Sequence, residues 1–135
     1  MNFPKKAWMI ILGLIVTIGI ADYTSSQIIK KSIKRVRPCK EIKLQEDLHL
    51  LVRCGSGYSF TSSHATNHFA IAGFLSLILL GNRRWLHFLI WAWAASIAYG
   101  QVYVGVHYPM DVVAGAILGG LIGRVVAKVV KQSLE

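Results

Sequence analysis

Long uncharged stretches are the feature that most limits what this chain can fold into. Between Lys6 and Lys30 the only charged residue is Asp22, and no charged residue lies between Trp85 and Met110. Each stretch exceeds the roughly 20 residues that an α-helix needs to cross about 30 Å of hydrocarbon. Both stretches therefore predict transmembrane helices.

Two further segments are long and apolar enough to be considered as spans. One runs from His64 to Gly81, and the other begins at Val112 and continues past Arg124 and Lys128, whose long side chains can reach the headgroup layer. We therefore predict an all-α, polytopic membrane helical bundle that forms one domain over residues 1–135. The four transmembrane helices are expected at about 7–37, 62–81, 85–106 and 109–131, with a solvent-side loop at about 38–61.

The point where the first helix stops and the packing of the last helix can also be predicted. Lys30, Lys34 and Arg37 recur with helical spacing, and Pro38 then stops the helix, because the residue before a proline avoids the helical region. Small residues recur every four positions in the last helix, at Gly115, Gly119 and Gly123. Since such a stripe lets a neighbouring backbone approach closely, and since Ala94 and Ala98 form a similar face, we expect the third and fourth helices to pack together.

The excess of basic residues has to be explained by a membrane rather than by nucleic acid. The chain has 15 Lys and Arg against 6 Asp and Glu, a formal net charge of +9. These residues separate apolar stretches instead of lining a polar fold, so the lipid bilayer is the expected partner and no nucleic acid is expected. By the positive-inside rule, the short turn at Arg83 and Arg84 lies in the cytoplasm. The opposite side still carries eight basic residues between Lys30 and Arg53, which indicates an anion site there.

Two local features leave alternatives open. Residues 1–21 also resemble a secretory signal, although cleavage would leave an odd number of spans. Cys39 and Cys54 both fall in the loop after the first helix, where they can form a disulfide if the loop faces an oxidising compartment. Two free thiols are the alternative.

Three separated stretches meet on the loop side of this predicted bundle. They are Lys30 with Arg37-Pro38, the sequence Phe60-Thr61-Ser62-Ser63-His64, and Gly100-Gln101 followed by His107 and Asp111. In order and spacing they resemble the three signatures of the type 2 phosphatidic acid phosphatase family, which also includes vanadium haloperoxidases. The first signature matches fully, the second departs at Thr61 and Ser63, and the third has Gly100 and Gln101 in place of Ser and Arg.

The resemblance covers about residues 7–130 and corresponds to the last four helices of the usual six-helix members. It implies an integral membrane lipid phosphatase that works through a phosphohistidine, with its site on the extracytoplasmic side of a bacterial inner membrane. The implied substrates are lipid phosphates such as undecaprenyl diphosphate, phosphatidic acid, phosphatidylglycerol phosphate or lipid A, and the first of these is our leading choice. A lipid phosphotransferase with the same site and a non-catalytic lipid-binding protein are the alternatives.

Chemistry assigns a role to each residue of these motifs. A phosphoryl group in transfer carries negative charge on its equatorial oxygens, which cations and N–H donors must meet. We expect His107 to attack phosphorus as a neutral imidazole held by Asp111, and His64 to act as general acid and then as general base. The residues expected to bind the phosphate are Lys30, Arg37, Ser62, Ser63 and Gln101.

The predicted site needs no cofactor. His64 and His68 share a helical face, but no carboxylate or thiol accompanies them at ligand spacing, so no zinc is expected. Gln101 replaces a fork-shaped cation with an amide that can still donate to a phosphate oxygen. Arg35 or Arg53 can supply the missing charge, whereas a site without a replacement would be weakened or inactive.

Overall fold

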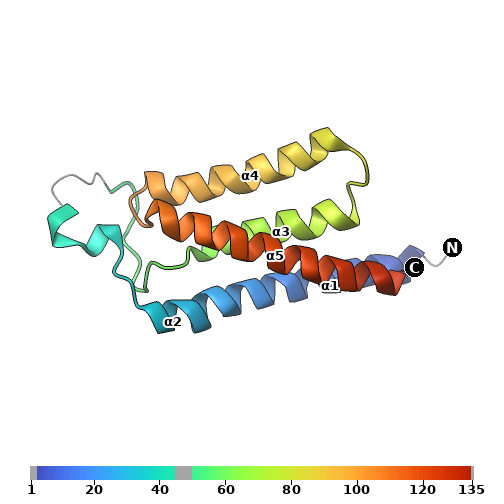
Figure 1. The fold of residues 1–135 in the computed structure, drawn as a ribbon, viewed down its shortest axis with the longest axis horizontal. Helices are drawn as coiled ribbons and strands as arrows, with labels where there is room; N and C mark the ends of the chain where they lie inside the picture. Colours follow the sequence, from blue (N-terminus) through green and yellow to red (C-terminus); the bar gives the residue numbers. More distant parts are fainter. Residues whose placement is uncertain (1–2, 45–49, 135) are drawn as a thin grey trace.

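The computed structural model describes residues 3–44 and 50–134 of the chain. Within these ranges every regular element is a helix, so the all-α fold class is confirmed. The elements are α1 (Phe3–Tyr23), the π-helix η1 (Thr24–Ile29), α2 (Lys30–Ile33), the 3₁₀ helices η2 (Pro38–Lys40) and η3 (Ile42–Leu44), α3 (Ser63–Ile78), α4 (Arg84–Tyr103) and α5 (Pro109–Leu134). Figure 1 shows α1, η1 and α2 as one continuous rod that lies beside α3 and α5, with α4 on the far side of these two helices.

The two ends of the bundle carry different parts of the chain. Both termini and the turn between α3 and α4 lie at one end, and the connections α2–α3 and α4–α5 lie at the other (Figure 1). This arrangement brings the end of α2, the start of α3 and the start of α5 to the same end of the molecule. All three sequence motifs therefore meet there.

The glycine stripe of α5 packs against α3, so the prediction that it packs against the third helix, α4, is wrong. A Cβ atom on Gly119 would overlap the carbonyl oxygen of Thr66, and one on Gly123 would overlap that of Ala70. The stripe points at the small-residue face of α3, where two backbones can touch. The large side chain of Trp91 approaches α5 at another position and keeps the α4 backbone farther away.

Small side chains fill the interior of the bundle and large apolar side chains cover its outside. Alanines such as Ala65, Ala70 and Ala94 are fully buried, whereas Phe88 is 73% exposed and Ile117 is 61% exposed. A soluble protein buries its large apolar residues, so this inverted distribution indicates that the exterior faces lipid.

Among the residues that the structure describes, two helical rods are long and apolar enough to cross a membrane, Lys5–Ile33 and Pro109–Leu134. By contrast, α3 has 16 residues and spans about 24 Å, less than the hydrocarbon thickness. The prediction of four complete transmembrane spans is thus supported for the first and last helices, and it stays a proposal for α3 and α4.

The first helical rod ends earlier than predicted, at Ile33 rather than at residue 37. Lys34 adopts a left-handed conformation with φ of 51°, and its N–H donates to the Lys30 carbonyl oxygen at 3.0 Å. The left-handed conformation of Lys34 ends the helix. The residues after it turn inward, so that Arg35 and Arg37 reach buried partners. Lys34 and Arg37 consequently do not share a helical face. The α4 helix likewise ends at Tyr103 rather than at 106.

Candidate active site

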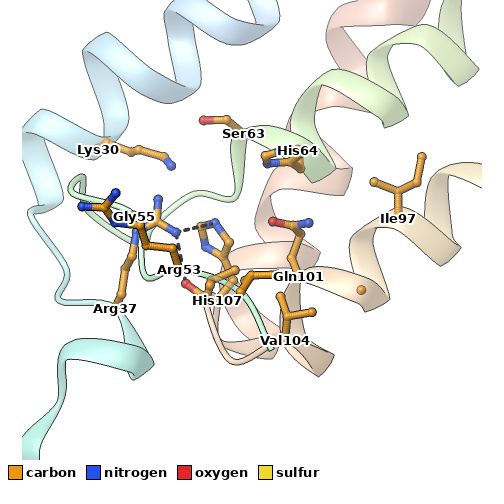
Figure 2. A pocket seen from close by; sticks show the side chains of 13 residues that line it. Lys30, Arg37, Arg53, Gly55, Ser63, His64, Ile97, Gln101, Val104 and His107 are labelled. Carbon is orange, nitrogen blue, oxygen red and sulfur yellow. Dashed lines mark hydrogen bonds between the residues drawn. The ribbon is translucent and has the colours of Figure 1, made fainter. Parts of the chain in front are cut away.

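A cavity of about 690 Å³ opens at the end of the bundle where the motifs meet. Figure 2 shows its cationic and imidazole side chains converging from α2, the loop, α3 and the α4–α5 connection. The predicted site residues on its wall are Lys30, Arg37, Ser63, His64, Gln101 and His107. The two histidines expected to act on one phosphorus atom therefore line one cavity.

The short connection between α4 and α5 sets the position of His107. Gly105 takes a φ of 75°, which only glycine adopts readily, and the chain turns there. The backbone carbonyl of Gln101 accepts hydrogen bonds from the N–H groups of Val106 at 3.3 Å and His107 at 3.1 Å. As a result, His107 is only 3% exposed and its backbone is anchored to the last turn of α4.

The two ring nitrogens of His107 face different partners. Nε2 lies 3.5 Å from Nη1 of Arg37, which can donate to it, and Nδ1 lies 3.6 Å from Oδ2 of Asp111. The distance to Asp111 is longer than a hydrogen bond, and Nδ1 makes no hydrogen bond with any described residue. A proton on Nδ1 would point toward the carboxylate and leave the lone pair of Nε2 on the cavity side.

Asp111 is fully buried and is held by partners that the motifs did not reveal. Arg35 donates from Nη1 to Oδ1 at 2.8 Å, and Oδ2 accepts from the Ser59 hydroxyl and, at 3.0 Å, from the Tyr108 N–H. The Arg35 guanidinium also stacks over the Tyr108 ring, 3.9 Å from its centre. Arg35 thus positions the carboxylate instead of supplying the cation missing at Gln101, and no sequence pattern pointed to Ser59.

The surroundings of His107 favour its neutral form. Burial, followed by the positive charges of Arg37 and Lys30, lowers the pKa of His107 from 6.5 to about 4, and Asp111 opposes this only in part. At neutral pH the imidazole therefore carries no charge. A neutral ring is the form that can act as a nucleophile.

This pKa predicts a loss of stability in acid. Unfolding exposes the ring and returns its pKa to about 6.5, so between pH 6.5 and 4 the unfolded chain binds more protons than the folded chain. Stability from this group is therefore present above pH 6.5 and falls as the pH drops toward 4, by up to about 3 kcal/mol. Thermal unfolding in detergent should show a smaller acid loss for His107→Gln than for wild type, and equal losses would contradict the assignment.

Lys30 and Arg37 supply fixed positive charge on one side of the cavity. Arg37 is held by its Nε, which donates to the Gly57 carbonyl at 3.0 Å, and by Nη1, which lies 3.4 Å from the Val106 carbonyl oxygen. Its guanidinium therefore sits beside His107 in a defined orientation. Such a planar fork can bind two phosphate oxygens at once.

The start of α3 brings its three polar residues to different places. Ser62 is fully buried, and its hydroxyl accepts from the Ala65 N–H as the helix cap. The hydroxyl thus caps the helix, and Ser62 is not among the residues that line the cavity, so its role in phosphate binding stays a prediction. Ser63 does line the cavity, with its hydroxyl 3.0 Å from that of Ser25 on η1, and His64 lines the cavity from the next position.

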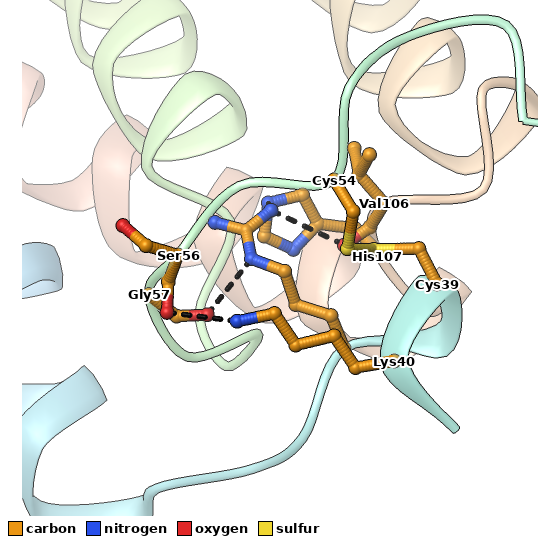
Figure 3. The surroundings of a disulfide bond; sticks show 8 residues. Cys39, Lys40, Cys54, Ser56, Gly57, Val106 and His107 are labelled. Carbon is orange, nitrogen blue, oxygen red and sulfur yellow. Dashed lines mark hydrogen bonds between the residues drawn. A yellow bond between two sulfur atoms is a disulfide. The ribbon is translucent and has the colours of Figure 1, made fainter. Parts of the chain in front are cut away.

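The loop after α2 carries a disulfide between Cys39 and Cys54 (Figure 3).

Metal binding can be examined for the described residue ranges only. Within 3–44 and 50–134, no group of three or more His, Cys, Asp or Glu side chains is placed to hold a metal ion. The expectation that the reaction needs no metal stays a prediction.

Comparisons with known proteins agree with the motifs. The family described as "PAP2 superfamily" matches residues 7–135. A lipid A 4'-phosphatase of Bacteroides thetaiotaomicron is 39% identical over 88% of this chain and 53% of its own length. An undecaprenyl-diphosphatase of Sulfolobus acidocaldarius is 31% identical over 87% of this chain and 54% of its own length. The chain spans about half the length of these curated relatives.

A solved structure also matches this fold. The crystal structure of Aquifex aeolicus LpxE superposes with a TM-score of 0.73 and 28% sequence identity, covering 93% of this chain and 75% of that one. The likeness therefore extends over nearly the whole of this chain.

Proposed function

Because this chain belongs to the PAP2 superfamily, as the three motifs predicted, we propose that it hydrolyses a phosphate ester or anhydride on a membrane lipid. One observation carries this proposal. A buried imidazole, His107, which is neutral at physiological pH, lies on the wall of a cavity that also holds Lys30 and Arg37, with the Asp111 carboxylate behind it. This is the arrangement that nucleophilic attack on a phosphoryl group requires.

In the first step, Nε2 of His107 attacks phosphorus. The bond between phosphorus and the lipid oxygen breaks, and the electron pair leaves with that oxygen, which takes a proton from protonated His64. Lys30, Arg37 and the Gln101 amide meet the charge on the equatorial oxygens. Asp111 stabilises the imidazolium that forms, because its carboxylate lies 3.6 Å from Nδ1 and needs only a small shift to accept a hydrogen bond.

In the second step, neutral His64 takes a proton from water while the water oxygen attacks phosphorus. The bond between phosphorus and Nε2 breaks, and its electron pair returns to His107. Inorganic phosphate leaves, and both imidazoles are back in their starting forms. The balance of atoms and protons requires water as the only co-substrate.

We place the cavity on the extracytoplasmic side of a bacterial inner membrane, with four helices in the bilayer. The turn that holds Arg83 and Arg84 lies at the opposite end of the bundle, which suits the cytoplasmic side. The Cys39–Cys54 disulfide lies on the cavity side and suits an oxidising compartment. A lipid headgroup can then reach the cavity from the outer leaflet.

For the substrate, we propose a lipid whose headgroup carries a terminal phosphate. The names of the relatives support lipid A and undecaprenyl diphosphate. The apolar lining at Ile97 on α4 and Val104 directly after it suits an amphiphile, since it can contact the first carbons of a lipid beside the phosphate. Phosphatidic acid and phosphatidylglycerol phosphate complete the panel to be tested.

The test is release of inorganic phosphate from these four lipids in detergent micelles. Wild type should release phosphate from at least one of them, and a chelator should leave the rate unchanged because no step uses a metal. Phosphate found only on an added alcohol would instead identify a phosphotransferase. Binding of the lipids without turnover would identify a non-catalytic lipid-binding protein and overturn the proposal.

A further inference from the structure

The loop segment from Arg53 to Gly57 lies over one wall of the catalytic cavity and is fastened there. Cys54 is bonded to Cys39, which comes two residues after Arg37. The Gly57 carbonyl accepts from Nε of Arg37 at 3.0 Å, and the Ser56 carbonyl accepts from Nζ of Lys40 at 2.9 Å (Figure 3). The loop is therefore tied by one covalent bond and two charged donors to the stretch that carries the first motif.

This attachment brings Arg53 to the cavity. Arg53 and Gly55 both line it, and Figure 2 draws Arg53 among the side chains of the cavity wall. Gly55 packs against Arg37, because a Cβ atom at this glycine would lie 3.5 Å from the guanidinium carbon. Two guanidinium groups thus sit on neighbouring parts of one wall.

The opposite wall of the cavity has no positive charge. The α4 residues that line it are Ile97, Gly100 and Gln101, and Val104 follows directly. Lys30 and Arg37 come from the first helical rod and the stretch after it. Among the described lining residues, Arg53 is the only further cation.

A transferred phosphoryl group has three equatorial oxygens that carry charge, and two fixed cations on one side leave part of that charge unmatched. Arg53 is solvent-exposed and makes no hydrogen bond or ion pair with any described residue. Within residues 3–44 and 50–134, no partner therefore holds its side chain away from an anion in the cavity. A second, smaller cavity that Arg53 shares with Lys40 gives the side chain room to move.

We infer that Arg53 is a phosphate-binding residue of this site, supplied by the loop and held in place by the Cys39–Cys54 disulfide, and that it compensates for the neutral Gln101 on α4. The inference rests on the proposed phosphatase function for its kinetic test. It can also be tested by anion binding alone.

The first test compares Arg53→Gln with wild type and uses Lys43→Gln as the matched control. Lys43 lies in the same loop, is exposed and does not line the cavity, so its substitution removes the same charge elsewhere. Arg53→Gln removes the hydrogen bond between an arginine and a charged phosphate, so we expect it to lose roughly tenfold or more in kcat/KM. Lys43→Gln should stay within about twofold of wild type, and Arg53→Lys should fall between the two.

The second test moves the charge to α4. Gln101→Arg in the Arg53→Gln background should recover most of the lost kcat/KM, because the new guanidinium reaches the same cavity from the opposite wall. The tether is tested by the double substitution Cys39→Ser and Cys54→Ser, which should lower kcat/KM in wild type but have little further effect once Arg53 is absent. Equal effects in both backgrounds would show that the disulfide acts independently of Arg53.

Binding of orthovanadate, measured by thermal shift in detergent, separates this inference from the proposed function. Wild type should bind it at least about tenfold more tightly than Arg53→Gln, whether or not any lipid is hydrolysed. An inactive wild type that keeps this difference would overturn the proposed function alone. Equal orthovanadate affinity, or an Arg53→Gln enzyme within twofold of wild type in kcat/KM, would overturn the role of Arg53.

Discussion

His107→Ala should lower phosphate release by at least about four orders of magnitude, because it removes the group that forms the covalent intermediate. The remaining cavity keeps Lys30 and Arg37, so it can still bind a phosphate but has no nucleophile to attack it. Single-turnover phosphate release measures the loss. Alkaline quenching of wild type during turnover should trap an alkali-stable, acid-labile phosphoenzyme that His107→Ala lacks.

His87→Ala is the matched control for the loss of an imidazole. His87 lies on α4 near the turn at the opposite end of the bundle, with Nε2 2.9 Å from the Gly81 carbonyl oxygen, and it does not line the cavity. Its substitution should leave turnover within about twofold of wild type. A His107→Ala enzyme that kept more than a few per cent of the wild-type rate would show that another group attacks phosphorus.

Gly119→Ala should be the most destabilising single methyl addition in the bundle. A Cβ atom at this position would overlap the Thr66 carbonyl oxygen, which belongs to the backbone of α3 and cannot move aside as a flexible side chain can. The two helices would have to separate, at a cost of about 3 kcal/mol or more. Because α3 carries His64 and α5 carries Asp111, activity should fall together with the thermal midpoint.

Gly19→Ala provides the control, since a Cβ atom at Gly19 in α1 would have no atom within 4 Å. Alanine also has the higher helix propensity, so this variant should be as stable as wild type or slightly more stable. Thermal unfolding of both variants in the same detergent makes the comparison. If Gly119→Ala unfolded at the wild-type temperature, the close contact between α3 and α5 would be wrong.

Much of the site could be predicted because its residues belong to spaced motifs next to apolar helices. Helical spans must cross the bilayer, so alternate connections lie on one side. Motifs at the end of the first predicted span, the start of the second and the end of the third therefore had to meet. This reasoning placed Lys30, Arg37, His64 and His107 together, and all four line one cavity. The chemistry of these side chains then predicted their roles.

The supports of the site could not be predicted in the same way. Ser59 and Arg35 both bind Asp111, from which they are separated by 52 and 76 positions in the sequence. Neither of them lies in a motif or a periodic pattern. The left-handed turn at Lys34 also depends on these contacts, because it lets the chain leave the helix and bring Arg35 inward. No local propensity of a lysine indicates that conformation.

The sequence by itself determined that this chain is a membrane bundle with basic and histidine residues gathered at one end, since hydrophobic length and charge placement are properties of single segments. Only the tertiary structure decided that the glycine stripe of α5 meets α3 rather than α4, that Ser62 caps a helix beneath the cavity, and that Arg53 rather than Arg35 lines the cavity. A periodic pattern tells which face of a helix is small or polar. Which neighbour that face meets depends on the shapes of all the helices packed together.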